Sequence, residues 1–387
     1  MRLFLSIIVA VFAVSAVRAD VAVDMTFLKQ IVPAPPVLSN LDPAPDDLGV
    51  AGARLGLEDN ATTGSFMGHR YELNEVVVDD GEDVIVAAAK ALGTSKFLIL
   101  DAPADTISKI ANMPEARDAL LFNASSGARS LRSEACRANL FHTLPSDQMR
   151  TDALMQFFVK KRWSDLTLIS GSHPSDKSYA AALETSAVKF GLKISERAEW
   201  VFDADMRRNA AQEVPLFTQK LGDYDALLIA DEIHDFGRYV LYNTWRARPV
   251  AGSEGLQAVA WSAVVEQWGA AQLQNRFEKL AARDMRPKDY AAWAAVRSIG
   301  EAVTRLNIAD PAALRAYLVS DEFELAGFKG RKMSFRAWNG QLRQPIPLVH
   351  PRALVTLAPL EGFLHQTTEL DTLGIDEPES TCTAFKG

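Results

Sequence analysis

Residues 146–170, SDQMRTDALMQFFVKKRWSDLTLIS, contain the pattern that decides the fold: an amphipathic helix followed at once by a short apolar strand. Ser146 is a suitable N-cap residue. The apolar side chains behind it recur at helical spacing; they are Met149, Ala153, Leu154, Phe157 and Phe158. The closing run DLTLIS is apolar without alternation, which is typical of a strand covered on both faces. A helix beside a fully buried strand indicates an α/β protein.

The same alternation extends along most of the chain. Four further apolar runs are predicted as strands: KFLIL (96–100), DALLF (118–122), YDALLIA (224–230) and LQAVAW (256–261). Helical patterns lie among them, notably one that starts at Ser178 and one at 289–307, whose apolar stripe we interpret as core packing. Strand–helix alternation predicts parallel sheets. Because 387 residues are too many for one ordinary core, we expect two lobes.

The first 19 residues have the pattern of a secretory signal peptide. Arg2 supplies the positive region, residues 3–14 are apolar, and Val17 and Ala19 are the small residues before a cleavage point. An uncleaved anchor is the alternative, but the apolar run is shorter than the ~20 residues that a membrane span needs. We therefore expect an exported protein without direct membrane insertion after cleavage near Ala19.

Composition excludes several classes of protein. With 48% hydrophobic and 23% charged residues, the chain is typical of a globular protein and not of a disordered one. Its formal net charge is −8, and loss of residues 1–19 would make it −10, because two arginines and no acids leave with them. Such a charge argues against nucleic acid or an anionic membrane as a partner.

The two cysteines, Cys136 and Cys382, are expected to meet an oxidising compartment after export. We predict a disulfide between them, and two unrelated buried thiols are the alternative. No His lies at ligand spacing from either cysteine, so they do not indicate a zinc site.

Ligands of parallel α/β sheets bind beyond the carboxyl ends of the strands. In this sequence those positions are rich in hydroxyl and carboxylate side chains, which suits a small polar ligand held between two lobes. The densest run is ADEIHDF (230–236). Asp231, Glu232 and Asp235 within it fit three interpretations: a helix N-terminus, contacts to a small molecule, or a site for a hard cation. The spacing of a strong calcium motif is missing.

Enzyme signatures are scarce. The sequence has no G-x-S-x-G, no P-loop, no G-x-G-x-x-G and no H-E-x-x-H motif. No nucleophile–base pair is evident, so we predict a protein that is not an enzyme and needs no cofactor. A hydrolase on the same scaffold is the least favoured hypothesis.

Several segments resemble type I periplasmic binding proteins, the leucine/isoleucine/valine-receptor family. GARLGLEDNATTGSFMGHRYEL (52–73) resembles the first helix and second strand of that family, and residues 123–170 resemble its first crossover between lobes. RPVAGSEGLQAVAW (248–261) resembles the return crossing, and MSFRAWNGQLRQPIPLV (333–349) the last one. The resemblance implies two Rossmann-like lobes with parallel sheets, joined by a three-crossing hinge that closes on a ligand.

The resemblance also implies lobe boundaries. The first lobe would comprise residues 20–142 and about 266–338, and the second lobe residues 143–265 and about 339–387. Three segments are similar, more narrowly, to the ABC transporter substrate-binding protein of PQQ-dependent alcohol dehydrogenase systems: WGAAQLQNRF (268–277), the tail from residue 350 to 365, and the late Cys382.

Amino-acid receptors of this family hold the ligand carboxylate with hydroxyls and backbone N–H groups after a first-lobe strand. Ser125 and Ser126 occupy that loop here, and Gly127 stands where a Thr is usual. A second-lobe Tyr that covers the ligand corresponds to Tyr179, and Trp261 is a further candidate contact, with a core position as its alternative.

The family's acid for a ligand ammonium would follow residue 261, where this sequence has Ser262 and Ala263. Asp231 and Glu232 are the candidates to replace that acid, for a cationic ligand or a metal complex, and Asp235 is expected to begin the next helix. PQQ itself is a tricarboxylate, and the acidic cleft disfavours it.

The predicted function is solute binding for an ABC permease, with a small molecule as ligand. The alternative is a sensing or accessory protein, possibly metal-related, on the same fold.

Overall fold

The computed structural model describes residues 21–33, 43–201 and 206–386, and for residues 206–208 it describes the backbone. The predicted signal peptide lies outside these residues. The first sheet is parallel throughout, in the order β2-β1-β3-β4-β5. Its strands are β1 (Val21–Gln30), β2 (His69–Val78), β3 (Phe97–Asp101), β4 (Leu120–Asn123) and β5 (Leu140–His142).

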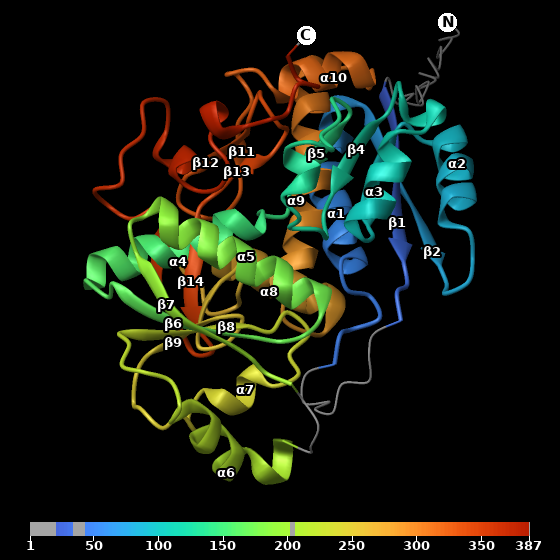
Figure 1. Cartoon of the computed structure of the whole chain (residues 1–387). Coiled ribbons are helices and arrows are strands. Elements are labelled where there is room, and N and C mark those ends of the chain that lie inside the picture. Colours follow the sequence, from blue (N-terminus) through green and yellow to red (C-terminus); the bar gives the residue numbers. More distant parts are fainter. Residues whose placement is uncertain (1–20, 34–42, 202–205, 387) are drawn as a thin grey trace, which may run out of the picture.

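Helices cover both faces of this sheet (Figure 1). One face shares a core with α1 (Val50–Met67), α8 (Ala270–Ala281), α9 (Pro287–Leu306) and α10 (Pro311–Leu318). The other face packs against α2 (Val84–Thr94) and α3 (Ala104–Ala111). The apolar stripe of α9 is fully buried, so its interpretation as core packing is confirmed.

The contact between α1 and α9 is unusually close. A Cβ added to Gly52 would lie 1.8 Å from the backbone oxygen of Asp289, so any side chain at this position would push the two helices apart. Glycine at position 52 therefore lets α9, which comes late in the chain, pack directly on the first helix.

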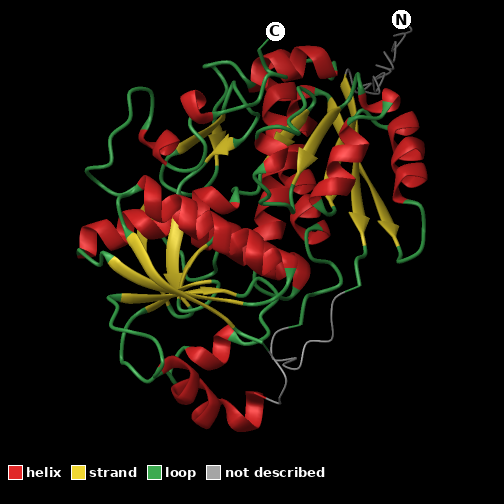
Figure 2. Cartoon of the chain, in the orientation of Figure 1, coloured by secondary structure: helices red, strands yellow, loops and turns green. Residues whose placement is uncertain are grey.

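The second sheet has the order β15-β14-β10-β9-β8-β6-β7. Five of its strands are parallel: β6 (Asp165–Ser170), β7 (Lys193–Glu199), β8 (Ala226–Ala230), β9 (Val250–Gly252) and β10 (Leu256–Ala258). An antiparallel hairpin, β14 (Ile346–His350) and β15 (Ala353–Ala358), extends it. One face packs against α4 (Asp147–Lys161) and α5 (Pro174–Lys189), the other against α6 (Met206–Thr218) and α7 (Gly237–Val240); Figure 2 shows these helices above and below the strands.

All five predicted strands and all three predicted helices are confirmed as elements of these types. The helix expected at Ser178 begins earlier, at Pro174. Proline suits the first helical position, and the carboxylate of Asp176 accepts a hydrogen bond from the backbone N–H of His173 (3.2 Å), which stabilises the helix start. The fold class, α/β with two Rossmann-like lobes, is confirmed, although the antiparallel hairpin of the second sheet was not predicted.

The chain passes between the two sheets three times: from β5 to α4, from β10 to α8, and into β14. A small antiparallel sheet precedes the third crossing and consists of β11 (Leu325–Ala326), β12 (Lys332–Phe335) and β13 (Leu342–Arg343). The first and third crossings lie side by side, because the N–H of His142 donates to the carbonyl of Gly340 (2.9 Å). Short 3₁₀ turns complete the structure at 114–116, 130–132, 369–372 and 377–379.

The disulfide between Cys136 and Cys382 is present, so this prediction is confirmed. Phe385, three residues further on, packs edge-on against Phe141, with 6.0 Å between ring centroids. The tail that we assigned to the second lobe therefore also contacts the end of the first sheet. The lobe boundaries themselves stay a prediction. Within the described ranges, no helix has the length and apolarity to cross a membrane.

Candidate functional site

A cleft of about 1020 Å³ lies between the two lobes. The first lobe contributes the segments that follow β1, β3 and β4, and the second lobe contributes the first turns of α4 and α5 and the loop after β8. Ser125, Ser126 and Glu232 line this cleft, and their role as ligand contacts stays a prediction. The cleft therefore lies at the carboxyl ends of the strands, where ligands of parallel α/β sheets bind.

The loop after β4 is held by its own hydrogen bonds. The amide oxygen Oδ1 of Asn123 accepts the backbone N–H groups of Ser125 (3.2 Å) and Ser126 (2.9 Å). The hydroxyl of Ser125 accepts from the N–H of Ala102 (3.0 Å) and donates to the same residue's carbonyl (3.0 Å). The hydroxyl of Ser126 accepts from the N–H of Ala128 (3.3 Å). Most polar groups of this loop are thus already paired within the first lobe.

Gly127 in this loop faces the carboxylate of Asp147, the first residue of α4. A Cβ on Gly127 would lie 2.2 Å from Oδ1 of Asp147, so the carboxylate fills the space that a side chain at position 127 would need. The N–H of Asp147 donates to the carbonyl of Gly127 (3.0 Å), which fixes this contact. Burial raises the pKa of Asp147, an effect that Arg150 opposes and Glu232 strengthens.

Glu232 lines the cleft in the second lobe and forms an ion pair with Arg150. The guanidinium donates twice to the Glu232 carboxylate (2.7 and 3.1 Å) and also to the carbonyl of Ala258 (3.1 Å). Burial opposes ionisation of Glu232, but the charge and hydrogen bonds of Arg150 outweigh it, so the pKa of Glu232 lies below its usual value. Ser253 donates a further hydrogen bond to Glu232 (2.8 Å). The predicted cleft acid is therefore present but already neutralised.

Tyr179 lies beneath this ion pair and does not line the cleft. Its side chain is fully buried, and the guanidinium of Arg150 lies 4.4 Å from its ring centroid. Burial raises the pKa of Tyr179. The contact to a cleft ligand that the family resemblance implies for Tyr179 is therefore not available in this structure.

Asp231 is also fully buried, outside the cleft lining. Its carboxylate accepts the backbone N–H groups of Asp235 (2.9 Å), Phe236 (2.9 Å) and Gly237 (2.7 Å). Asp231 therefore stabilises the start of α7. The sequence analysis expected Asp235 to have this role. The side chain of Asp235 lies 3.4 Å from Nε2 of His173.

Trp261 is buried in the core of the first lobe. Its indole stacks on Tyr290, with 4.8 Å between ring centroids and 12° between planes, and donates to Gln274 (3.2 Å). The alternative given above, a core residue at a strand end, describes this position.

No group of three or more His, Cys, Asp or Glu side chains in the described part of the chain is arranged to hold a metal ion. The physical reason at the predicted position is that each candidate has another partner. Asp231 accepts three backbone N–H groups, Glu232 pairs with Arg150, and Asp235 faces His173.

The wall in the first lobe combines a second ion pair with apolar side chains. Lys288 pairs with Asp101 (2.9 Å), and the ammonium of Lys29 donates to the carbonyl of Asp46 (2.7 Å). The apolar side chains Ile31, Val32 and Val77 also line the cleft, and all three are exposed, by 37%, 52% and 52%.

Arg132 connects the cleft loop to the hinge. This arginine is 1% exposed and donates to the carbonyls of Ser126 (3.1 Å), Ala128 (2.9 Å) and Leu144 (3.0 Å) and to Oε1 of Gln341 (2.6 Å). Burial lowers the pKa of Arg132 to about 9, although the nearby charge of Asp147 opposes this shift.

Sequence reasoning missed four of these residues: Arg132, Asp147, Arg150 and Lys288. It searched the loops after strands, whereas Asp147 and Arg150 belong to the first turn of a helix and Lys288 to the start of another. The available signal was the run SDQMR (146–150), which directly follows the first hinge crossing.

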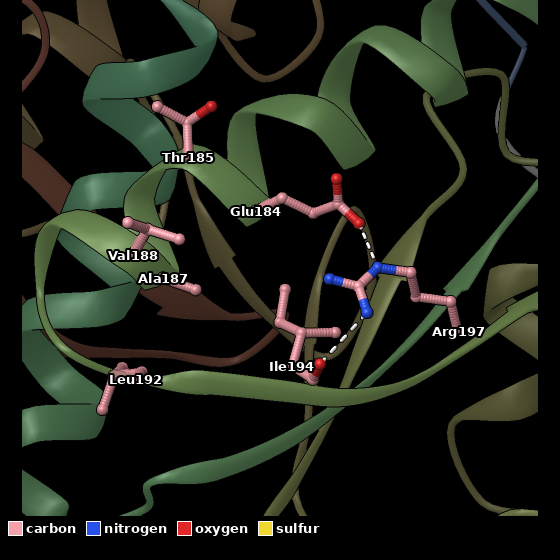
Figure 3. Close-up of a pocket in the computed structure, with 7 residues that line it drawn as sticks. All are labelled: Glu184, Thr185, Ala187, Val188, Leu192, Ile194 and Arg197. Carbon is pink, nitrogen blue, oxygen red and sulfur yellow. Dashed lines mark hydrogen bonds and ion pairs between the residues drawn. The ribbon is translucent and has the colours of Figure 1, made fainter.

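A second, smaller cavity lies on the outer face of the second lobe (Figure 3). Residues from α5 and β7 line it, and Glu184 and Arg197 form an ion pair across it. This cavity of about 440 Å³ receives residues from one lobe alone, so lobe closure could not enclose a ligand there.

Comparisons with known proteins agree with this geometry. A model of the periplasmic binding protein family matches residues 45–204. A branched-chain amino acid ABC transporter periplasmic ligand-binding protein from Burkholderia xenovorans superposes with a TM-score of 0.68 at 16% identity, over 87% of this chain and 95% of that one. A solute-binding protein of an ABC transporter from R. palustris, in complex with benzoate, superposes with a TM-score of 0.63 at 13% identity, over 93% of this chain and 99% of that one.

A leucine-, isoleucine-, valine-, threonine- and alanine-binding protein from Brucella ovis, in its closed conformation, gives a TM-score of 0.64 at 13% identity, over 88% of this chain and 92% of that one. The comparison with curated proteins gives no match. At these identities the likeness shows the fold: the chain has the type I periplasmic binding protein fold.

Proposed function

We propose that this protein is the periplasmic solute-binding component of an ABC transporter and traps a small ligand by closure of its two lobes. The observation that carries the proposal is the cleft of about 1020 Å³, which lies at the carboxyl ends of the strands and receives residues from both lobes. Ser125, Ser126 and Glu232 are its proposed contacts among the residues predicted from sequence.

Fold and family support the proposal. The family model that matches residues 45–204 is that of periplasmic binding proteins, and the similar structures described above are ligand-binding components of ABC transporters. The signal-peptide pattern of residues 1–19 fits delivery to the periplasm, with cleavage near Ala19, where an inner-membrane permease would be the partner.

We further propose a link to PQQ-dependent alcohol oxidation. It is supported by the similarity of residues 268–277 and of the tail to the binding protein of such systems. Deletion of the permease gene tests this assignment. Equal growth defects on alcohols after loss of the permease or of this protein support transport, whereas a defect only after loss of this protein supports an accessory or sensing role.

Binding itself is tested with purified protein and a thermal-shift panel of amino acids, amines, organic acids, PQQ, Ca²⁺ and lanthanides. A true ligand at 100 times its Kd should stabilise the protein by about 2.7 kcal/mol. Ser178→Trp, on the exposed cleft side of α5, should abolish the shift by filling the cleft. Thr185→Trp, on the outer face of the same helix, should preserve it. The proposal would be contradicted if both variants lost the thermal shift equally. It would also be contradicted if no compound shifted the melting temperature of the wild-type protein.

A further inference from the structure

The loop after β4 offers few free donors to a carboxylate. Anion sites of this kind need free N–H groups or hydroxyls. Here the N–H groups of Ser125 and Ser126 both donate to Asn123, and the N–H of Ala128 donates to the hydroxyl of Ser126. An anionic ligand would have to break these bonds to use the three N–H groups, and the hydroxyl of Ser126, which accepts from Ala128, still has its O–H to donate.

The cations at the cleft are also occupied. Lys288 pairs with Asp101 within the first lobe, and Arg150 pairs with Glu232 within the second. The ammonium of Lys29 donates to backbone carbonyls on either side of residue 47. Backbone carbonyls do not cancel a charge, so of the two cations that line the cleft in the described residues, Lys288 is neutralised by Asp101, whereas Lys29 keeps its charge and is bound to the segment 46–48.

Of the cleft carboxylates Asp101, Asp147 and Glu232, Asp147 has the longest ion-pair distance, although the charge of Arg132 also acts on it. Its one ion pair joins Oδ1 to a guanidinium nitrogen of Arg150 at 3.5 Å, and that guanidinium already makes two shorter bonds to Glu232. The side chain is 21% exposed and lies against Gly127, so the carboxylate stands in the loop where a ligand carboxylate would otherwise bind. A negative charge at this position repels an anion and attracts a cation.

We propose, on the basis of the proposed solute-binding function, that the ligand is an organic cation with a protonated amine, whose ammonium group binds Asp147 beside Gly127. The rest of the ligand extends along the apolar wall of Ile31, Val32 and Val77 in the first lobe. The ammonium supplies the close donor that Asp147 lacks, and the exposed apolar side chains gain a partner when the lobes close.

Two matched series of compounds test the charge preference without any variant. Benzylamine, benzyl alcohol and benzoate share one skeleton, and butylamine, butanol and butyrate share another. We expect the amine of at least one series to raise the melting temperature of the purified protein and to bind in calorimetry, with the alcohol and the acid of that series binding at least roughly tenfold more weakly, about the effect of one lost charge-assisted hydrogen bond.

Asp147→Asn then tests the residue. It keeps the shape of the side chain and removes the charge, and amine affinity should fall by on the order of 10- to 100-fold. Asp79→Asn is the matched control, because Asp79 carries the same charge at the exposed mouth of the cleft and is screened by solvent. It should change amine affinity by less than about threefold.

Binding of acids in preference to amines would overturn the amine proposal and leave solute binding intact. Amine binding that is equally weakened by Asp79→Asn and Asp147→Asn would also overturn it, since the effect would then come from general charge. If no compound of these series or of the wider thermal-shift panel binds, both the amine proposal and the proposed function are contradicted.

Discussion

Replacing Arg150 by Met is expected to destabilise the protein by about 3 kcal/mol. Removal of one partner of a buried ion pair costs about 3–5 kcal/mol, because the other charge stays buried without compensation. The side chains of Arg150 and Glu232 are 19% and 22% exposed, so solvent screens part of the loss and the lower end of the range applies. Ser253 continues to donate a hydrogen bond to Glu232 in the variant, which also reduces the loss of stability.

A double-mutant cycle measures this coupling. Glu232→Gln in the Arg150→Met background removes the uncompensated charge, so at least about half of the lost stability should return. The assay is urea unfolding followed by tryptophan fluorescence. Arg54→Met is the control, because its pair with Glu75 is exposed on both sides and should contribute no more than about 1 kcal/mol.

The same pair predicts a pH dependence. The folded-state pKa of Glu232 is depressed, so its contribution to stability is fully present above the unfolded-state pKa of about 4.3 and is lost as pH falls through the folded value. The stability difference between wild type and Glu232→Gln should therefore shrink below about pH 4. A loss below about 1 kcal/mol in Arg150→Met at neutral pH, with additive effects in the cycle, would refute the reasoning.

Three further outcomes are expected. Reduction of the Cys136–Cys382 disulfide, or its replacement by two serines, should lower the melting temperature. The separation of 246 residues gives an entropic upper bound of about 5.5 kcal/mol on the lost stability, and an unchanged melting temperature would contradict the prediction. Gly52→Ala should destabilise by about 1–3 kcal/mol in urea unfolding through overpacking against α9, whereas Gly93→Ala on an open surface of α2 should be neutral or stabilising. Arg132→Met should destabilise by at least about 2 kcal/mol and speed hydrogen exchange in the cleft loop and the hinge; wild-type exchange rates there would contradict the coupling.

The fold could be predicted because its signals are local. Continuous apolar runs such as 165–170 and 226–230 are buried on both faces, and this burial pattern is visible in composition alone. The antiparallel hairpin at 346–358 was not predicted, because its place in the sheet depends on a distant part of the chain. Its strands join a sheet whose other members lie about a hundred residues earlier or more, and nothing in the hairpin itself reveals that partner.

The candidate site was predictable only in part. Ser125, Ser126 and Glu232 follow strands, and strand ends converge on the cleft by topology. Which acid is compensated depends on side chains from distant elements, such as the reach of Arg150 to Glu232 over 82 residues. Sequence reasoning therefore found the acidic run but placed Asp231 in the cleft, where the structure does not have it. Asp231 stabilises a helix start, and Glu232 is neutralised.

The two ion pairs at the cleft each lie within one lobe, which bears on closure under the proposed function. Lys288 and Asp101 both belong to elements of the first sheet's lobe, and Arg150 and Glu232 both belong to the other. Each wall of the cleft satisfies its own charges, so separation of the lobes breaks neither pair. Closure then depends on interactions that the ligand supplies, since a ligand shifts a conformational equilibrium only through its differential affinity for the two states. In the amine proposal, Asp147 at the start of α4, directly after the first crossing, is the position where the ligand charge would add to that difference.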